Sequence, residues 1–414
     1  MLRLSDSSRM AGKIKQSPQD FIVEEILGAC KVLEKDTTYE SSPILLSSAD
    51  PRFCVFIMQK ENWNTVQALK AVAGALKRGQ KSTGFAGTKD RVAISTQICS
   101  VFGATPEQLL GVHVKDVKIN GAWASDSGIR MGDLQGNRFT IVAREAIGAE
   151  RIDDINAELK GRFPNYFGPQ RFGSRKNNFD IGLAMLKGDF RAAAMEFLTN
   201  TSNETNVGAV EARKRLAEEQ DFKEALRYFP MHLKYERMML EYLARFSANF
   251  ANSIKRLPRA VSLMFVHSVE AQIFNMELEE RIKGGSIGIR DTDLACSLNE
   301  CGFPDMSAVA HSSSFVEGAD KLLPVANVVG YETKETTEFE RDAMERLGIT
   351  TESFKVRGLN ELNSKGTYRP LVATYTGFEG SPSEDGKSAT FRFSLPSGSY
   401  ATVLLEEFIS DGKG

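Results

Sequence analysis

A glycine-rich segment with three consecutive charges is the first place in this sequence where chemistry is expected. Residues 84–93 are Gly-Phe-Ala-Gly-Thr-Lys-Asp-Arg-Val-Ala. Gly87 permits a tight turn or a close backbone approach that larger residues resist. Asp90 lies between Lys89 and Arg91, a setting that favours its carboxylate form and suits a nucleophile or a general base. A surface turn with solvated charges would have the same composition, and spacing alone does not separate the two interpretations.

A second segment, residues 163–173, combines four aromatic residues with two prolines and repeated glycine. This composition disfavours a long regular helix or strand. Exposed aromatic rings beside Asn165, Gln170 and Arg171 are what base stacking and base-edge recognition require. A hydrophobic plug at a domain junction is an equally good explanation of the composition.

The distribution of charge also bears on nucleic-acid binding. The chain has 52 Lys and Arg and 54 Asp and Glu, so its net charge of −2 excludes a globally basic binder. Locally, residues 70–91 carry six basic side chains against Asp90 alone, and residues 160–176 carry no acid. Both segments therefore suggest a surface that binds a phosphate backbone. In residues 70–91, part of the positive charge is explained equally well by a solvated helix face. The basic side chains of residues 160–176 are Lys160, Arg162, Arg171, Arg175 and Lys176.

No cofactor or metal motif stands out in the sequence. Residues 74–82 resemble a phosphate-binding loop, but Gln80 separates the second glycine from the lysine and a helix precedes it, which discounts a nucleotide-dependent ligase or NTPase. The four histidines form no zinc-binding pattern. We therefore expect neither metal nor cofactor.

Cysteine usage and hydropathy suggest where the protein works. The five cysteines are odd in number and form no CxxC pair, which argues against a disulfide framework and a structural zinc site and favours a reducing, intracellular compartment. No signal-peptide pattern and no run of 18 apolar residues occurs, so no membrane association is expected. The cysteines are Cys30, Cys54, Cys99, Cys296 and Cys301.

The pattern of elements predicts one domain interrupted by another. Strands are expected at residues 53–58, 96–102, 138–143, 388–395 and 400–405, and helices from Asn64 or Thr65 to Gly79 and over 151–161. Helix formers dominate residues 178–283, with helical spacing over 235–249 and 260–282, and residues 284–367 are mixed and loop-rich. A β-rich start, a helical middle and a β-rich end are typical of an α+β domain with an insertion whose ends lie close together.

Together, these blocks resemble the TruD family of RNA pseudouridine synthases. The resemblance rests on Gly87–Arg91 followed by Ala93 and Gln97, and on Asn165–Gly173. Supporting blocks occur in the family's order between residues 13 and 407: Pro18–Glu25, Arg130–Asn137 and Leu395–Thr402.

The resemblance implies a fold. It predicts an α+β pseudouridine synthase catalytic domain with a mixed, mostly antiparallel sheet, formed by residues 1–189 and 368–414. An inserted TruD-specific α+β domain would occupy residues 190–367, and residues 178–189 would form the first crossover.

The resemblance also assigns roles to individual residues. Asp90 falls on the family's catalytic aspartate, Phe167 on the aromatic that stacks on the target uracil, and Asn165 on a residue lining the same pocket. Lys15 lies where the family carries a basic residue near the nucleophile, and Tyr400 aligns with a pocket aromatic. The remaining motif residues are assigned to substrate or RNA contact: Lys89, Arg91, Gln170 and Arg171.

The implied activity is the conversion of uridine to pseudouridine in tRNA, with uridine 13 of the D-arm as the target. This isomerisation adds and removes no atoms, which fits the absence of a cofactor motif. The expected partner is tRNA, with no obligate protein partner, and the expected location is the cytoplasm. The competing hypothesis is a non-catalytic tRNA-binding module or RNA chaperone, which would share the basic and aromatic loops but would not need Asp90.

Overall fold

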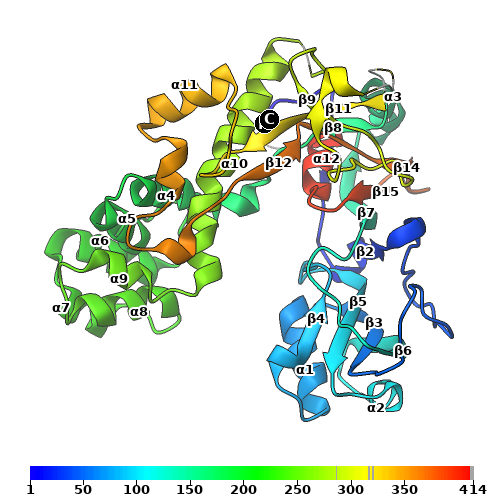
Figure 1. Cartoon of the computed structure of the whole chain (residues 1–414), viewed down its shortest axis with the longest axis horizontal. Helices are drawn as coiled ribbons and strands as arrows, with labels where there is room; N and C mark the ends of the chain where they lie inside the picture. The colour runs from blue at the N-terminus through cyan, green and yellow to red at the C-terminus, as the bar shows by residue number, and fades with distance from the viewer. Residues whose placement is uncertain (286, 316–317, 319–320, 411–414) are drawn as a thin grey trace.

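The computed structural model describes residues 1–285, 287–315, 318 and 321–410. Figure 1 shows an arched molecule with a helical lobe at one end and a β-rich lobe at the other. The long helix α10 (Arg259–Lys283) and the strands beside it connect the two lobes. None of the helices in the described part of the chain is long and apolar enough to cross a membrane.

The main sheet is mixed and mostly antiparallel, as expected. Its strands run in the order β14-β15-β7-β2-β5-β3-β6, with β4 on β5 and β1 on β7 and β16. Among the described residues, only β2 with β5 and β1 with β16 pair in parallel, and the second pairing joins residues 10–11 to 409–410. The two ends of the described chain therefore meet at this sheet. The strands are β1 (Met10–Lys13), β2 (Phe21–Ile26), β3 (Phe53–Glu61), β4 (Thr83–Phe85), β5 (Ile94–Phe102), β6 (Val117–Ser125), β7 (Gly136–Ile147), β14 (Thr376–Pro382), β15 (Ser388–Pro396) and β16 (Ile409–Ser410).

The helices in contact with strands of this sheet include α1 (Thr65–Ala75), α2 (Pro106–Leu110), α3 (Ile152–Leu159) and α12 (Ala401–Phe408). Helix α1 begins where the sequence predicts, because the Asn64 side chain accepts a hydrogen bond from the Val66 amide. It ends at Ala75, before the expected stop at Gly79.

The strand expected over residues 400–405 is wrong, because this segment begins helix α12. Leu404 and Phe408, four residues apart, are both completely buried, which is helical spacing. A short apolar run fits a strand or a buried helix equally well, and here packing selects the helix.

The helical lobe comprises α4 (Asn178–Leu186), α5 (Phe190–Thr199), α6 (Val207–Glu219), α7 (Phe222–Tyr228), α8 (Lys234–Leu243), α9 (Phe250–Ile254), part of α10 and α11 (Glu338–Leu347). Helix α4 crosses α10 so closely that a Cβ at Gly182 would overlap the carbonyl oxygen of Phe265. Residues 178–189, expected as a crossover, thus contribute Ile181, Met185 and Leu186 to the core of this lobe.

The C-terminal part of α10 packs against the lobe that holds the main sheet. Ala271, Phe274 and Leu278 join the same apolar core as Phe391 and Phe393 of β15. Beside them lies a small sheet of order β10-β9-β11-β12, and a separate pair joins β13 to β8. These strands are β8 (Arg162–Pro164), β9 (Leu294–Cys296), β10 (Ala310–His311), β11 (Leu323–Val328), β12 (Thr367–Pro370) and β13 (Val372–Thr374). The domain limits at 189/190 and 367/368 stay a prediction; the second falls within β12.

A disulfide between Cys30 and Cys301 corrects the expectation that the cysteines are unpaired. It ties a turn after β2 to a loop after β9, across a sequence separation of 271 residues. Because the partners are so far apart in sequence, only the tertiary fold reveals the pairing. The expectation of a reducing compartment, which rested on unpaired cysteines, loses that support.

Candidate active site

The loop that carries Asp90 connects β4 to β5 and is fixed at three points. The Lys89 amide donates to Thr65 Oγ1 at 2.9 Å, and Gln97 Nε2 donates to the Gly87 carbonyl at 3.0 Å. Lys60 Nζ donates to the Asp90 carbonyl at 2.9 Å. Since Lys60 and Gln97 lie on adjacent strands and Thr65 begins α1, rigid elements of the fold determine where Asp90 stands.

The Asp90 carboxylate faces the basic side chain that the resemblance singles out. Lys15 Nζ lies 2.5 Å from Asp90 Oδ2, and the side chain of Asp90 stays 42% exposed. The same ammonium lies 4.3 Å from the centroid of the Phe21 ring, a cation–π contact. Lys15 itself has a left-handed backbone with φ of 59°. The ion pair and the ring contact therefore hold a charged but accessible carboxylate at the surface.

Beneath the loop lies a second, buried ion pair. Lys89 Nζ is 3.2 Å from Glu25 Oε1, and the two side chains are 4% and 0% exposed. Burial raises the pKa of Glu25, and the Lys89 ammonium opposes that shift. The Lys89 ammonium, expected to contact substrate, thus points to Glu25, although the residue still lines the cavity described next. Arg91 is exposed and does not line that cavity.

Lys60 is the second buried cation at this site. Its side chain is fully buried, and burial lowers its pKa to about 8 against the opposing charge of Asp90. The sequence carries a signal for Lys60, because a lysine that continues the apolar run of a buried strand must find a polar partner.

A cavity of about 550 Å³ opens in front of Asp90. Apolar residues contribute part of its lining, among them Phe21, Phe139 and Leu134. Five of the predicted site residues besides Asp90 line it: Lys15, Lys89, Gln170, Arg171 and Tyr400. The fold thus gathers residues from both ends of the chain around one carboxylate.

Asn165 and Phe167 do not line this cavity but a separate one of about 240 Å³, and Arg369 contacts both. Arg369 Nη2 donates to Asn165 Oδ1 at 2.6 Å, and its guanidinium lies 4.2 Å from the Phe167 ring centroid. The Asn165 amide group is also occupied, donating to the Pro370 carbonyl at 2.9 Å. Sequence reasoning did not find Arg369, because nothing in the loop-rich segment before it marks it out.

The aromatic rings of residues 163–173 are mostly buried, which corrects the expectation of exposed stacking platforms. Phe163, Tyr166 and Phe167 are 0%, 1% and 8% exposed. The Phe167 backbone is held by two hydrogen bonds to the Asn275 side chain, and its ring packs edge-on against Phe274. This segment therefore does seal the junction with α10, as the plug interpretation predicts.

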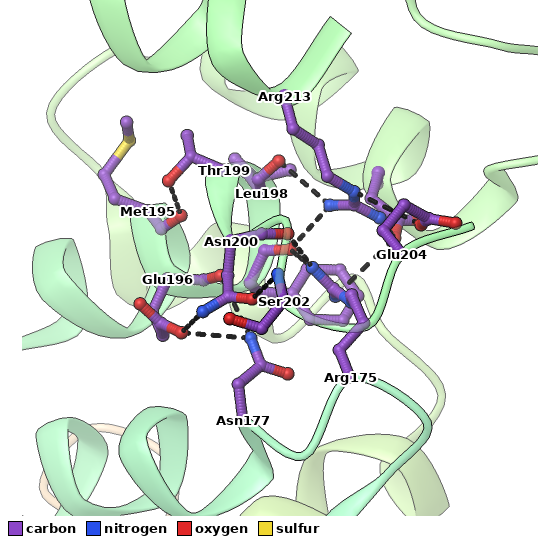
Figure 2. Close-up of polar contacts among 12 residues, drawn as sticks. Arg175, Asn177, Met195, Glu196, Leu198, Thr199, Asn200, Ser202, Glu204 and Arg213 are labelled. Carbon is purple, nitrogen blue, oxygen red and sulfur yellow. Dashed lines mark hydrogen bonds and ion pairs between the residues drawn. The ribbon is translucent and has the colours of Figure 1, made fainter. Parts of the chain in front are cut away.

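Arg175 also departs from the expected phosphate track. Its Nη1 donates to the carbonyls of Phe197 and Asn200, at 2.9 and 3.0 Å, where α5 ends. Figure 2 shows Arg175 and Arg213 both pointing at this helix end. Arg175 satisfies carbonyl groups that the helix leaves unpaired, so its cluster offers fewer free cations than the sequence suggests.

Comparisons with known proteins find relatives along nearly the whole chain. The family model for tRNA pseudouridine synthase D (TruD) matches residues 2–408. Among curated relatives, two named "Probable tRNA pseudouridine synthase D" come from Methanococcoides burtonii and Archaeoglobus fulgidus. They are 32% and 33% identical over 97% and 98% of this chain and 93% and 96% of their own lengths. A crystal structure described as the "Putative tRNA pseudouridine synthase D (TruD)" from Methanosarcina mazei superposes with a TM-score of 0.77. Its identity is 29%, over 99% of this chain and 95% of that one.

The fold and these matches show the class of protein: it is an isomerase of the pseudouridine synthase type that acts on RNA. The chain belongs to the TruD family of tRNA pseudouridine synthases.

Proposed function

We propose that this enzyme converts uridine 13 in the D-arm of tRNA to pseudouridine, with Asp90 as its catalytic carboxylate. The observation that carries the proposal is the Asp90 carboxylate itself. It is accessible, opens into the 550 Å³ cavity, and is held by Lys15 on its side chain and by Lys60 on its backbone.

The reaction breaks the N1–C1′ glycosidic bond and forms a C5–C1′ bond after the base turns. Every atom of the base stays in the product except the C5 proton, which exchanges for a proton on N1. Asp90 begins the reaction either by attack on C1′ or by removal of a ribose proton. Both routes place the carboxylate beside the sugar, so the cavity in front of Asp90 is where the target nucleoside binds.

The target base must leave its stack to reach that cavity, at a cost of a few kcal/mol. Stacking on an aromatic ring returns roughly 1–3 kcal/mol. Phe167 is the proposed ring. It is 8% exposed and does not line the Asp90 cavity, so the guanidinium of Arg369 or Arg171 beside it must move before the uracil reaches a ring face. Tyr400 and Gln170 line the Asp90 cavity and would contact the base directly.

The other predicted residues receive roles that follow from their positions. Asn165 holds Arg369 and so positions the wall behind the base. Lys89 acts through its buried ion pair, by fixing the loop before Asp90. Arg171 and the exposed Arg91 would contact RNA phosphates, and the enzyme would work where tRNA is present, in the cytoplasm.

The test of the target is position mapping on tRNA transcripts. Wild-type enzyme should form one pseudouridine, at position 13, as detected by mass spectrometry of nuclease fragments. A transcript with cytidine at position 13 should give none. Product at other positions in both transcripts would contradict the assignment.

The test of the stacking ring compares two substitutions at one position. Phe167→Tyr keeps a ring, whereas Phe167→Ala removes it, so the second should lower turnover by at least tenfold more than the first. Phe172→Ala, at the partly buried aromatic in the same segment, is the control. Equal loss in both Phe167 variants would end the stacking assignment.

A further inference from the structure

A separate cavity lies on the other side of Arg171 from Asp90. It has a volume of about 310 Å³, and its lining includes Phe167, Arg171, His267, Glu270 and Val328, with residues 364–367 closing it. Arg171 lines both this cavity and the Asp90 cavity. A nucleotide chain with its target base near Asp90 would therefore bring a neighbouring base here.

Glu270 is the unusual group in this cavity. It is 4% exposed, and its Oε1 atom has no hydrogen-bond partner in the described part of the chain. Burial raises the pKa of Glu270 to about 7, although Ser364 and the charge of Arg171 oppose the shift. An unpartnered buried acceptor costs free energy, roughly 1–3 kcal/mol, unless a ligand pairs with it.

The wall and the charge of the cavity select the kind of ligand. Phe167 and Val328 supply flat or apolar surface, which suits an aromatic base. A phosphate would be repelled by the Glu270 carboxyl oxygen but attracted by Arg171 of the same lining, so the apolar wall and the unpartnered oxygen are what favour a base here. No group of metal-ligating side chains is found at this cavity among the described residues. A neutral aromatic ring with an N–H donor at its edge would pack against the apolar wall and donate a hydrogen bond to Glu270 Oε1.

We propose that this cavity binds the base of a nucleotide next to the target, and that Glu270 accepts a hydrogen bond from that base's exocyclic amino group. Adenine, guanine and cytosine carry such a group. Uracil has a single N–H between two carbonyl oxygens, which would face the same carboxyl group. The enzyme would thereby read an amino-bearing base beside the uridine that it isomerises.

The position of Glu270 relative to Phe167 supports this role. Both Glu270 and Asn275 lie on α10, and the Asn275 side chain holds the Phe167 backbone through two hydrogen bonds at 2.9 and 3.0 Å. The helix therefore fixes the distance between the proposed stacking ring and the proposed reading group. This proposal rests on the proposed function.

The experiment measures kcat/KM on tRNAs with single analogue substitutions at each nucleotide flanking the target. Inosine replaces guanosine, purine riboside replaces adenosine, and pyrimidin-2-one riboside replaces cytidine, so that each change removes one exocyclic amine. At one flanking position the wild-type value should fall by roughly tenfold, the loss expected for one base-edge contact.

Variants of Glu270 test whether its carboxyl group recognises the flanking base. Glu270→Leu should abolish the difference between natural base and analogue, and Glu270→Gln, which keeps an acceptor oxygen, should retain part of it. Glu277→Gln, at another buried glutamate of α10 that does not line this cavity, is the matched control and should retain all of it. The analogue series on wild-type enzyme alone tests the proposal if Glu270→Leu fails to fold.

The contradicting outcomes are distinct. Equal wild-type kcat/KM for every analogue overturns the inference while the proposed function stands. Tighter RNA binding by Glu270→Leu regardless of the flanking base identifies a phosphate site and also overturns it. No pseudouridine in any RNA overturns the proposed function, and the inference with it.

Discussion

The buried pair Glu25–Lys89 allows a quantitative test of how the fold supports the Asp90 loop. Glu25→Gln keeps the size of the side chain but removes the charge facing Lys89, 3.2 Å away and 4% exposed. Breaking a buried ion pair from one side costs roughly 3–5 kcal/mol, because the remaining charge stays buried without compensation. We therefore expect a loss of that size in the free energy of unfolding at pH 7.

The double variant Glu25→Gln with Lys89→Met sharpens the test. It removes both charges, and replacing a whole buried pair is often close to neutral. The double variant should recover most of the stability lost by Glu25→Gln alone. Glu352→Gln, at an exposed pair with Lys355, is the control and should change little.

The assay is urea unfolding followed by circular dichroism, with free energies compared in a double-mutant cycle. If Glu25→Gln unfolds like wild type, or if the double variant is as unstable as the single one, the reasoning from burial is refuted. The double variant also measures whether Lys89 contributes to RNA affinity beyond holding the loop.

Three further predictions concern other parts of the molecule. Lys60→Met should lower single-turnover pseudouridine formation at least tenfold while leaving tRNA affinity within a few-fold, because Lys60 holds only the Asp90 backbone; an equal loss in both would point to misfolding. Thiol titration in denaturant should find three thiols without reductant and five with it, since Cys30 and Cys301 are joined; five in both would exclude the disulfide. Burial and the nearby Glu340 raise the pKa of Glu277 to about 8, so unfolding releases a proton between about pH 4.5 and 8, and wild-type stability should fall as pH rises through that window. The loss should be smaller in Glu277→Gln, measured by thermal unfolding at pH 5 and pH 8; parallel pH profiles would show that Glu277 does not titrate in this range.

The sequence predicted the surroundings of the Asp90 loop better than it predicted the rest of the fold. The strands over 53–58 and 96–102 and the Asn64 cap are confirmed, because apolar runs and capping residues act locally. These elements place the Asp90 loop between β4 and β5. The mixed, mostly antiparallel sheet expected from the resemblance is confirmed as well.

What the sequence did not predict depends on contacts between distant residues. Arg369 reaches Asn165 across 204 positions, and Cys30 meets Cys301 across 271. The composition of residues 160–176 suggests that Arg175 is a free cation, whereas in the fold its guanidinium donates to a carbonyl group at the end of α5. Composition likewise gives the number of aromatic rings in residues 163–173 but not which of them are buried.

The most direct test of the central claim is tritium release from tRNA labelled at uridine C5, comparing wild type with Asp90→Ala. Removing this partly exposed carboxylate leaves the three backbone anchors of its loop in place, so folding and tRNA binding should stay within a few-fold of wild type. The account predicts release by wild type and none by Asp90→Ala. Release by both at similar rates would contradict it.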